Sequence, residues 1–277
     1  MTFEGIELSP ESGAPIELYE FTVYDVIYRY ASGSTDYLLG PVTYAAMTIS
    51  HTEIEDSDEL AKEDMTITVP RDFPINEFFR VAPPSDVILL TVFEVHRTDT
   101  DQEAVAIWTG RVLNCESKGV SADLSCENVY TSIQRNGLQR QYCPDCPLEL
   151  YAFPCNAPIE DFQIDVTLST VSGLVLTAGA FGGYDDGRFA GGFITWQRVP
   201  GQIEKRAIKA HVGTQIQLTH PIVDLPADAE IKAAPGCKHN PDDCTNFFAN
   251  YDNYGGYPDM TTTNPFGTNN VFLGVDS

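Results

Sequence analysis

Basic residues are scarce in this chain of 277 residues. It has 16 lysines and arginines against 40 aspartates and glutamates, which leaves a formal net charge of −24. A surface this acidic repels phosphate backbones and anionic lipid surfaces. The composition therefore argues against a nucleic-acid binder that wraps a basic surface around its target. It also argues against membrane binding by the protein alone.

Long apolar runs are missing too, because no stretch of about 18 apolar residues occurs that could span a bilayer as a helix. The first eleven residues contain three glutamates and no lysine or arginine, which predicts no secretory signal and folding in the cytoplasm of the producing cell. General disorder is excluded, since 43% of the residues are hydrophobic and 11% are aromatic.

Helical periodicity is rare, and 18 prolines and 21 glycines interrupt the little there is. Only the short segments 57–64 and 128–135 have helical character. Alternation of apolar and polar residues is frequent instead, and it predicts strands with one solvent-facing side. The run Val87–Val95 is almost continuously apolar and predicts a strand buried on both faces. Strands are predicted at residues 21–30, 65–69, 87–95, 104–113, 162–168, 174–178, 193–198, 215–219 and 230–234.

The predicted fold class is mostly β, with two β-barrel-like units followed by an irregular C-terminal segment. The strand pattern stops near residues 139–156, where cysteines and prolines crowd together, and it stops again past Pro235. We therefore expect an N-terminal β domain over residues 1–145 and a C-terminal β domain over residues 146–277.

Motifs for catalysis are absent from the sequence. It contains no H-E-x-x-H, no G-x-S-x-G, no phosphate-binding G-x-x-x-x-G-K-[ST] and no G-x-G-x-x-G that opens a helix. The doublet Asp185–Asp186 before Gly187 is interpreted as a hairpin turn rather than a calcium loop, and Asp242–Asp243 as part of a solvated loop. We therefore expect a protein that is not an enzyme. The five histidines are scattered, at His51, His96, His211, His220 and His239.

Five of the seven cysteines fall into two short clusters, which contain Cys143, Cys146 and Cys155, then Cys237 and Cys244. An odd number of cysteines in a chain expected to fold in a reducing compartment favours metal binding or plain burial over disulfides. Thiolates select zinc or an iron–sulfur cluster. Buried free thiols and disulfides remain as alternatives.

The spacing of these cysteines bears on which metal group they would hold. Zinc knuckles usually use two Cys-x2-Cys pairs, and only Cys143 and Cys146 have that spacing here. The longer gaps, from Cys146 to Cys155 and from Cys237 to Cys244, suit a bulkier cluster better. The role of Cys143 stays open between a ligand and a fifth, spare thiol next to the site, and His239 is interpreted as a solvated loop residue rather than a ligand. Cys115 and Cys126 lie in strand sequence and are expected to be small core residues of a hairpin.

Four stretches carry a resemblance to a known family. They are Ser12–Phe21 with Tyr28–Tyr30, then Ile107–Val112 with Leu124–Cys126, then Cys146-Pro147 with Cys155, and finally Gly236-Cys237 with Cys244 and Tyr254–Pro258. In this order the sequence resembles the tail-tip hub proteins of long-tailed phages and gene transfer agents, which carry an iron–sulfur domain at their C-terminal end.

The resemblance implies a 4Fe-4S iron–sulfur cluster bound by Cys146, Cys155, Cys237 and Cys244, with zinc as the less favoured alternative. One departure concerns the residue after the second of these cysteines, where the family usually has glycine and this chain has Asn156. Asparagine tolerates a left-handed backbone better than other non-glycine residues, so the turn is expected to survive. The four-thiolate set leaves no open iron position, which implies a structural cluster.

The resemblance also implies a structural virion protein of the tail tip, made in the host bacterial cytoplasm. Such a hub forms a homotrimer that connects the distal tail protein and tail tube to the central fibre or spike proteins. It forms part of the DNA exit channel, through which tape-measure protein and DNA pass in transit, and its acidic residues are expected to keep DNA from sticking. The alternatives are a zinc-stabilised, adhesin-like binding module, favoured by the aromatic residues between 247 and 257, and a cytoplasmic metalloenzyme.

Overall fold

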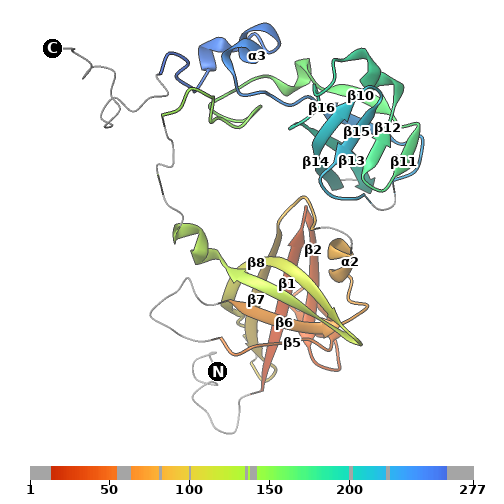
Figure 1. Cartoon of the computed structure of the whole chain (residues 1–277). Coiled ribbons are helices and arrows are strands. Elements are labelled where there is room, and N and C mark those ends of the chain that lie inside the picture. Colours follow the sequence, from red (N-terminus) through yellow and green to blue (C-terminus); the bar gives the residue numbers. More distant parts are fainter. Residues whose placement is uncertain are drawn as a thin grey trace, which may run out of the picture. The chain divides into compact units, whose positions relative to one another are not determined.

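In the computed structural model, residues 14–54, 64–80, 83–99, 101–134, 137, 142–199, 202–222 and 225–260 are described. The chain divides into two compact units, drawn in Figure 1. The first unit comprises Met1–Asn136, Gln197–Glu204 and Pro221–Asp224, and the second comprises Gly137–Trp196, Lys205–His220 and Leu225–Ser277. No helix in the described part of the chain is long and apolar enough to cross a membrane.

The first unit is built on a nine-stranded sheet with the order β3-β4-β2-β1-β7-β8-β9-β6-β5. Figure 1 shows this sheet curling, but its end strands β3 and β5 are not hydrogen-bond neighbours, so it forms a half-barrel rather than a closed barrel. A short helix, α2 (Asn76–Phe79), and a 3-10 turn, η2 (Val129–Gln134), accompany the sheet. The strands are β1 (Pro15–Val23), β2 (Val26–Ser32), β3 (Tyr37–Leu39), β4 (Val42–Met47), β5 (Ser50–His51), β6 (Met65–Pro70), β7 (Ile88–His96), β8 (Val105–Lys118) and β9 (Ser121–Asn128).

Two strand predictions in this unit need correction. The segment 21–30 is not one strand, because β1 and β2 form a hairpin in which Val23 pairs with Val26. The two residues between them carry no glycine or Asn-Gly signal, and Tyr24 supplies the left-handed backbone with φ of 53°. The strand β7 is not buried on both faces, because Leu89 is 53% exposed while its neighbours Ile88 and Leu90 are fully buried. Successive side chains of this apolar run therefore alternate between the core and the protein surface.

The larger of two described core clusters in the first unit is formed mainly by side chains of this sheet. Side chains from β1, β6, β7 and β9 meet there, because alternate residues of each strand point to the same side. Phe21 and Phe73 pack edge to face with ring centroids 5.6 Å apart. Among the largest buried side chains of this core are Tyr19, Phe21, Ile67, Ile88, Leu90 and Leu124.

Packing explains the glycine in the sequence Trp108-Thr109-Gly110-Arg111 of β8. A Cβ atom on Gly110 would lie 2.2 Å from the carbonyl oxygen of Glu127 and 2.3 Å from the ring of Trp108. Glycine is therefore required where the indole ring lies over the strand. On the same strand, Arg111 donates from Nε to the Glu127 carboxylate of β9 at 2.7 Å, which joins the two strands side by side.

Replacing Gly110 with alanine is expected to lower the free energy of unfolding of the first unit by about 3 kcal/mol, because both atoms that a Cβ would meet belong to tightly packed groups. Urea unfolding with protease mapping of the two units measures this loss. The adjacent exposed substitution Thr109→Ala serves as the control and is expected to change stability by less than about 0.5 kcal/mol. A Gly110→Ala protein as stable as the parent would contradict this packing.

The second unit contains a seven-stranded sheet with the order β10-β16-β13-β14-β15-β12-β11. Its core includes the aromatic rings of Phe181 and Phe189, which pack edge to face at 5.2 Å and are fully buried. The strands are β10 (Ile164–Thr167), β11 (Thr170–Ser172), β12 (Val175–Thr177), β13 (Phe193–Val199), β14 (Gln202–Val212), β15 (Gln215–Leu218) and β16 (Glu230–Ala234). Short helical turns are η3 (Ile159–Asp161), η4 (Gly179–Gly183), α3 (Pro241–Asn246) and η5 (Tyr251–Asn253).

The prediction of a mostly β fold is confirmed by these two sheets. The described chain after Ala234 has only the short turns α3 and η5 up to residue 260, so the predicted change to irregular structure past Pro235 is confirmed as well. The helical character predicted for 128–135 corresponds to η2. The segment predicted at 57–64 lies outside the described residues except for Asp64.

Candidate metal centre

Four cysteines of the second unit lie in two irregular segments on either side of its sheet in the sequence. Cys146 and Cys155, called here the first cysteine pair, precede β10. Cys237 and Cys244, the second cysteine pair, follow β16, and Cys244 lies in α3. Cys155 and Cys244 are buried, whereas Cys146 and Cys237 are partly exposed.

The four thiols are close enough to influence one another. The pKa of Cys244 is raised to about 11, chiefly by burial and then by negative charge at Cys237, Cys146 and Cys155. Burial likewise raises the pKa of Cys237, and Asp243, Cys146 and Cys155 add to the increase against the opposing hydrogen bond from His239. Thiolates gathered in this way repel one another unless a cation is present, and binding of a metal removes that penalty.

Three of the sulfur atoms accept hydrogen bonds from N–H donors. The amide of Gly255 donates to Cys146 Sγ at 3.3 Å, and the amide of His239 donates to Cys237 Sγ at 3.2 Å. The side-chain amide of Asn250 lies 3.5 Å from Cys155 Sγ. N–H donors of this kind tune the metal that a sulfur ligand binds. Three of the four sulfur atoms therefore have a donor beside them.

Two side chains hold the cysteine pairs together. The ring of His239 has Nδ1 2.8 Å from the carbonyl oxygen of Cys146, and the amide of Cys146 donates to the carbonyl of His239 at 2.8 Å. Donation to a carbonyl requires the proton on Nδ1. Asn250 donates to the carbonyl of Cys155 at 2.7 Å, and Cys244 Sγ donates to the carbonyl of Asn250 at 3.3 Å. His239 is thus a bridge between the segments.

The Tyr-Gly-Gly-Tyr-Pro stretch closes against the first cysteine segment. A Cβ atom on Gly256 would lie 2.5 Å from the carbonyl oxygen of Pro144, and one on Gly255 would lie 2.6 Å from Leu148. Tyr254 donates from its hydroxyl to the Pro144 carbonyl at 2.7 Å. The two glycines are therefore needed because the chain passes too close for side chains.

The turn after Cys155 has the backbone that Asn156 was expected to tolerate. Asn156 adopts φ of 54°, in the left-handed region, and its amide donates to the carbonyl of Ala152 at 2.9 Å. Asparagine is one of the few non-glycine residues found there regularly. The departure from glycine at this position is accordingly compatible with the turn.

The residues fit a group that takes four thiolate ligands, because soft sulfur donors are what zinc and iron–sulfur clusters select. The residues that would hold such a group are Cys146, Cys155, Cys237 and Cys244. Over the described parts of the chain, no three His, Cys, Asp or Glu side chains are grouped tightly enough to hold a single metal ion.

The other three cysteines have contacts of their own. Cys143 donates from Sγ to the carbonyl of Asp145 at 3.0 Å. Cys126 is buried in β9, as expected for a core residue, and burial raises its pKa to about 12. Cys115 is in the same hairpin but only partly buried, and its Sγ donates to Asn76 Oδ1 at 3.5 Å. The prediction of a core residue therefore holds for Cys126 and only in part for Cys115.

The prediction that Asp242–Asp243 belongs to a solvated loop is wrong for Asp243. This carboxylate is buried and forms an ion pair with Arg188, with Oδ1 2.7 Å from Nη1. Sequence reasoning missed the pair because 54 residues separate its members and neither has a motif around it. By contrast, Asp186 accepts the amide of Gly213 at 2.7 Å and Gly187 has φ of 84°, so a turn is present as predicted. It connects η4 to β13, however, and is not the turn of a hairpin.

The aromatic run that favoured a binding module is partly used for packing. Phe248 is 4% exposed and packs in one cluster with Cys155 and Ala157. Phe247 contacts Phe162 with ring centroids 5.7 Å apart. At the end of the run, Tyr251 and Tyr254 stack at 5.7 Å and the former is half exposed. The run thus stabilises the segment that carries the second cysteine pair.

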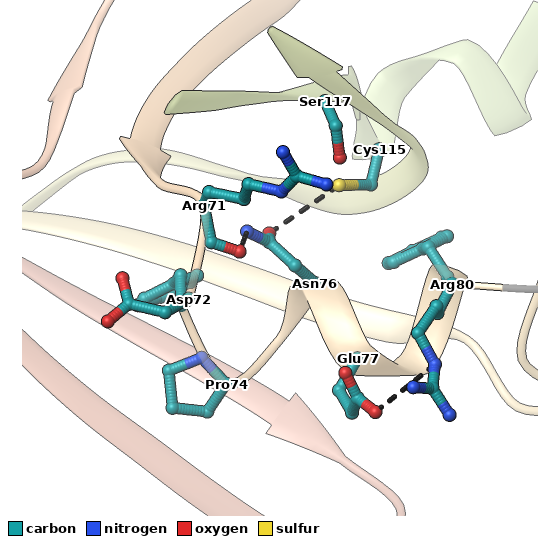
Figure 2. A pocket seen from close by; sticks show the side chains of 10 residues that line it. Arg71, Asp72, Pro74, Asn76, Glu77, Arg80, Cys115 and Ser117 are labelled. Atoms are coloured by element: carbon teal, nitrogen blue, oxygen red, sulfur yellow. Dashed lines mark hydrogen bonds and ion pairs between the residues drawn. The ribbon is translucent and has the colours of Figure 1, made fainter. Parts of the chain in front are cut away.

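Figure 2 shows a polar cavity of the first unit beside α2, about 520 Å³ in volume. Asn76 spans it, donating to the carbonyls of Pro70 and Arg71 and accepting from Cys115. At its rim the charges of Glu77 and Arg80 pair at 3.3 Å. Asn76, Cys115, Glu77 and Arg80 therefore each have a polar partner at this cavity.

Comparisons with known proteins relate the chain to phage and virion proteins. Residues 187–264 match the family described as "Phage conserved hypothetical protein BR0599". The whole chain shares its fold with a chain of a virion. That chain comes from a structure titled "Virion of native gene transfer agent (GTA) particle", with a TM-score of 0.80 and 15% identity, over 100% of this chain and 98% of the other.

A curated relative extends the comparison to a bacterial genome. An uncharacterized protein of Xylella fastidiosa (strain 9a5c) is 30% identical over an alignment of 137 residues, with 46% of this chain and 28% of the relative covered. The chain therefore spans little more than a quarter of the length of that relative.

Proposed function

We propose that this chain is a structural component of a phage-type virion, a tail-tip hub whose C-terminal part is organised by a 4Fe-4S cluster. The observation that carries the proposal is the fold similarity to a chain of a gene transfer agent particle, which extends over the full length of both chains. The family match at residues 187–264 supports it independently, because that family is described as a conserved phage protein. The role proposed is structural rather than enzymatic.

The cluster is proposed to cross-link two segments of the second unit. When bound, it would supply iron–thiolate bonds that tie residues on both sides of the second sheet to one inorganic core. The chain's own residues would support the sulfur ligands by hydrogen bonds. The amides of Gly255 and His239 and the side chain of Asn250 direct N–H groups at three sulfur atoms. Because the segment after Pro235 has few alternating apolar residues, its folding is expected to depend on these links.

The assembly proposed is a homotrimer at the end of the tail tube. Its neighbours would be the distal tail protein or tube on one side and the central fibre or spike proteins on the other, with tape-measure protein and DNA passing through in transit. The charge of −24 supports a conduit role, because carboxylates along a channel would repel DNA and prevent adhesion. The protein is proposed to be made in the host cytoplasm and to act in the virion without binding membranes itself.

Two measurements test this proposal. Gold-labelled antibody against the chain is expected to mark the tail tip in electron micrographs of particles from the producing cells, and label on the capsid or only in the particle-free fraction would contradict it. Anaerobically purified protein is expected to contain iron and acid-labile sulfide in equal amounts. One zinc ion per chain without iron would instead select the zinc-stabilised alternative.

A further inference from the structure

One arginine contacts the residue in front of each cysteine of the second pair. Arg188 donates from Nη2 to the carbonyl oxygen of Gly236, which precedes Cys237. The same guanidinium pairs with Asp243, which precedes Cys244, with Nη1–Oδ1 2.7 Å and Nη2–Oδ2 2.9 Å. The planar fork of arginine matches a carboxylate in this two-point arrangement, which a lysine cannot reproduce.

The surroundings of Arg188 prevent the guanidinium from moving away. Its side chain is 10% exposed and that of Asp243 is 7% exposed. The guanidinium carbon lies 3.8 Å from the centre of the Phe247 ring and 5.5 Å from that of Phe248. The backbone is fixed as well, because the amide of Gly236 donates to the carbonyl of Arg188 at 3.2 Å.

Asp243 also forms hydrogen bonds within the loop between Cys237 and Cys244. Its Oδ2 accepts the amide of Lys238 at 3.0 Å, and its own amide donates to the side chain of Asn240 at 2.8 Å. Asn240 is the N-cap of α3, the helix that contains Cys244. The carboxylate thus links the beginning and the end of the loop, and Arg188 binds the carboxylate.

The charge of Arg188 is needed as well, because Asp243 is buried and its carboxylate pairs with the guanidinium. Removal of only one member of a buried ion pair leaves an uncompensated charge. Arg188 therefore permits the loop to use a carboxylate as its internal acceptor.

We propose that Arg188 is the positioning residue of the second cysteine pair, which fixes Cys237 and Cys244 in place before any metal is bound. The effect of Arg188 on metal binding rests on the proposed metal centre, whereas its contacts with the loop that carries Cys237 and Cys244 do not. The residue touches no ligand in this role and acts through Gly236 and Asp243.

The test uses the variants Arg188→Met and Arg188→Lys, with Arg111→Met as the matched control. Arg111 is likewise a partly buried arginine paired with a glutamate, in the first unit. Each full-length protein is freed of metal under reducing conditions, and the alkylation rate of every cysteine is measured by mass spectrometry. Iron and sulfide are determined on anaerobically purified samples of the same proteins.

In Arg188→Met, alkylation of Cys237 and Cys244 is expected to accelerate by about tenfold or more, because local opening replaces a buried, hydrogen-bonded loop. Cys115 and Cys126 in the first unit are expected to keep their rates, which shows that the protein remains folded there. Arg188→Lys keeps the charge without the fork and is expected to lie between Arg188→Met and the parent. Arg111→Met is expected to match the parent at Cys237 and Cys244 and in iron content.

A double variant keeps the test decisive if Arg188→Met loses much of its structure. Adding Asp243→Asn to Arg188→Met removes the stranded carboxylate, so α3 is expected to open less often than in Arg188→Met alone. The readout is hydrogen exchange of the Cys244 amide, which donates to the carbonyl of Asn240. Faster exchange in the double variant than in Arg188→Met would overturn a role exerted through Asp243.

Equal alkylation rates in parent and Arg188→Met at Cys237 and Cys244 would overturn the positioning role whether or not metal is found. Absence of iron, sulfide and zinc from the parent would overturn the proposed metal centre and leave the alkylation result to decide the positioning role. Where the parent holds iron, the content in Arg188→Met is expected to fall with the increase in alkylation, and full retention of iron would overturn the role.

Discussion

Serine in place of Cys244 is expected to abolish iron binding and to make the chain from residue 142 onward sensitive to protease. Cys244 is buried and is influenced electrostatically by the other three thiols, so serine there would remove one of the four proposed ligands. Binding free energy of a structural metal becomes folding free energy, and the segment that depends on it is expected to open. Visible absorbance, iron content and limited proteolysis followed by mass spectrometry measure the outcome.

The matched control is Cys143→Ser, which changes a cysteine in the neighbouring loop that bonds only to the carbonyl of Asp145 among the contacts described for its sulfur. It is expected to keep the iron and the protease resistance of the parent. The first unit is expected to remain resistant in both variants, because its sheet is formed within residues 15–128. Equal protease resistance in Cys244→Ser and the parent would count against a structural metal.

Alanine in place of Gly236 is expected to destabilise the second unit by about 3 kcal/mol or more, since the added Cβ would meet only rigid backbone. That atom would lie 1.9 Å from the carbonyl oxygen of Ala190 and 2.7 Å from the amide nitrogen of Gly192. Because Gly236 precedes Cys237 and binds Arg188 through both its amide and its carbonyl, iron content is expected to fall in parallel. Thermal unfolding and metal analysis measure the two effects.

The control for this prediction is Gly183→Ala, at a glycine of the same unit where a Cβ would have no neighbour within 4 Å. It is expected to change stability by less than about 0.5 kcal/mol. A Gly236→Ala protein that unfolds at the parent temperature would show that the chain does not pass this close to residues 190–192.

Alternation was sufficient to predict strands that present one face to a core, such as β6 and β16. It failed at Tyr24, because a hairpin turn without glycine or Asn-Gly leaves no local signal. It also failed at Leu89, because an exposed leucine between buried neighbours resembles a core residue in sequence. Local patterns report the periodicity of an element but not the environment on each side of it.

The two cysteine clusters are visible in the sequence from their spacing, and the choice of Cys146, Cys155, Cys237 and Cys244 as ligands stays a prediction from the family resemblance. The residues around them were not predictable, since Arg188, His239 and Asn250 act through contacts with residues far along the chain. The interpretation of Asp243 as solvated failed for this reason: its cation arrives from a turn before β13. Asn156 was predictable because left-handed backbone is a local property.

The closure of Tyr254–Tyr257 on Cys143 and Pro144 has a consequence for biosynthesis. The amide of Tyr257 donates to the carbonyl of Cys143 at 2.9 Å. Residues at the start of the second unit therefore contact residues that are synthesised more than a hundred positions later. A ribosome delivers the chain from its N-terminus, and the nine-stranded sheet has all its strands once Asn128 has emerged. The first unit can thus mature during translation, whereas the contact at Cys143 can form only after Tyr257 has left the ribosome.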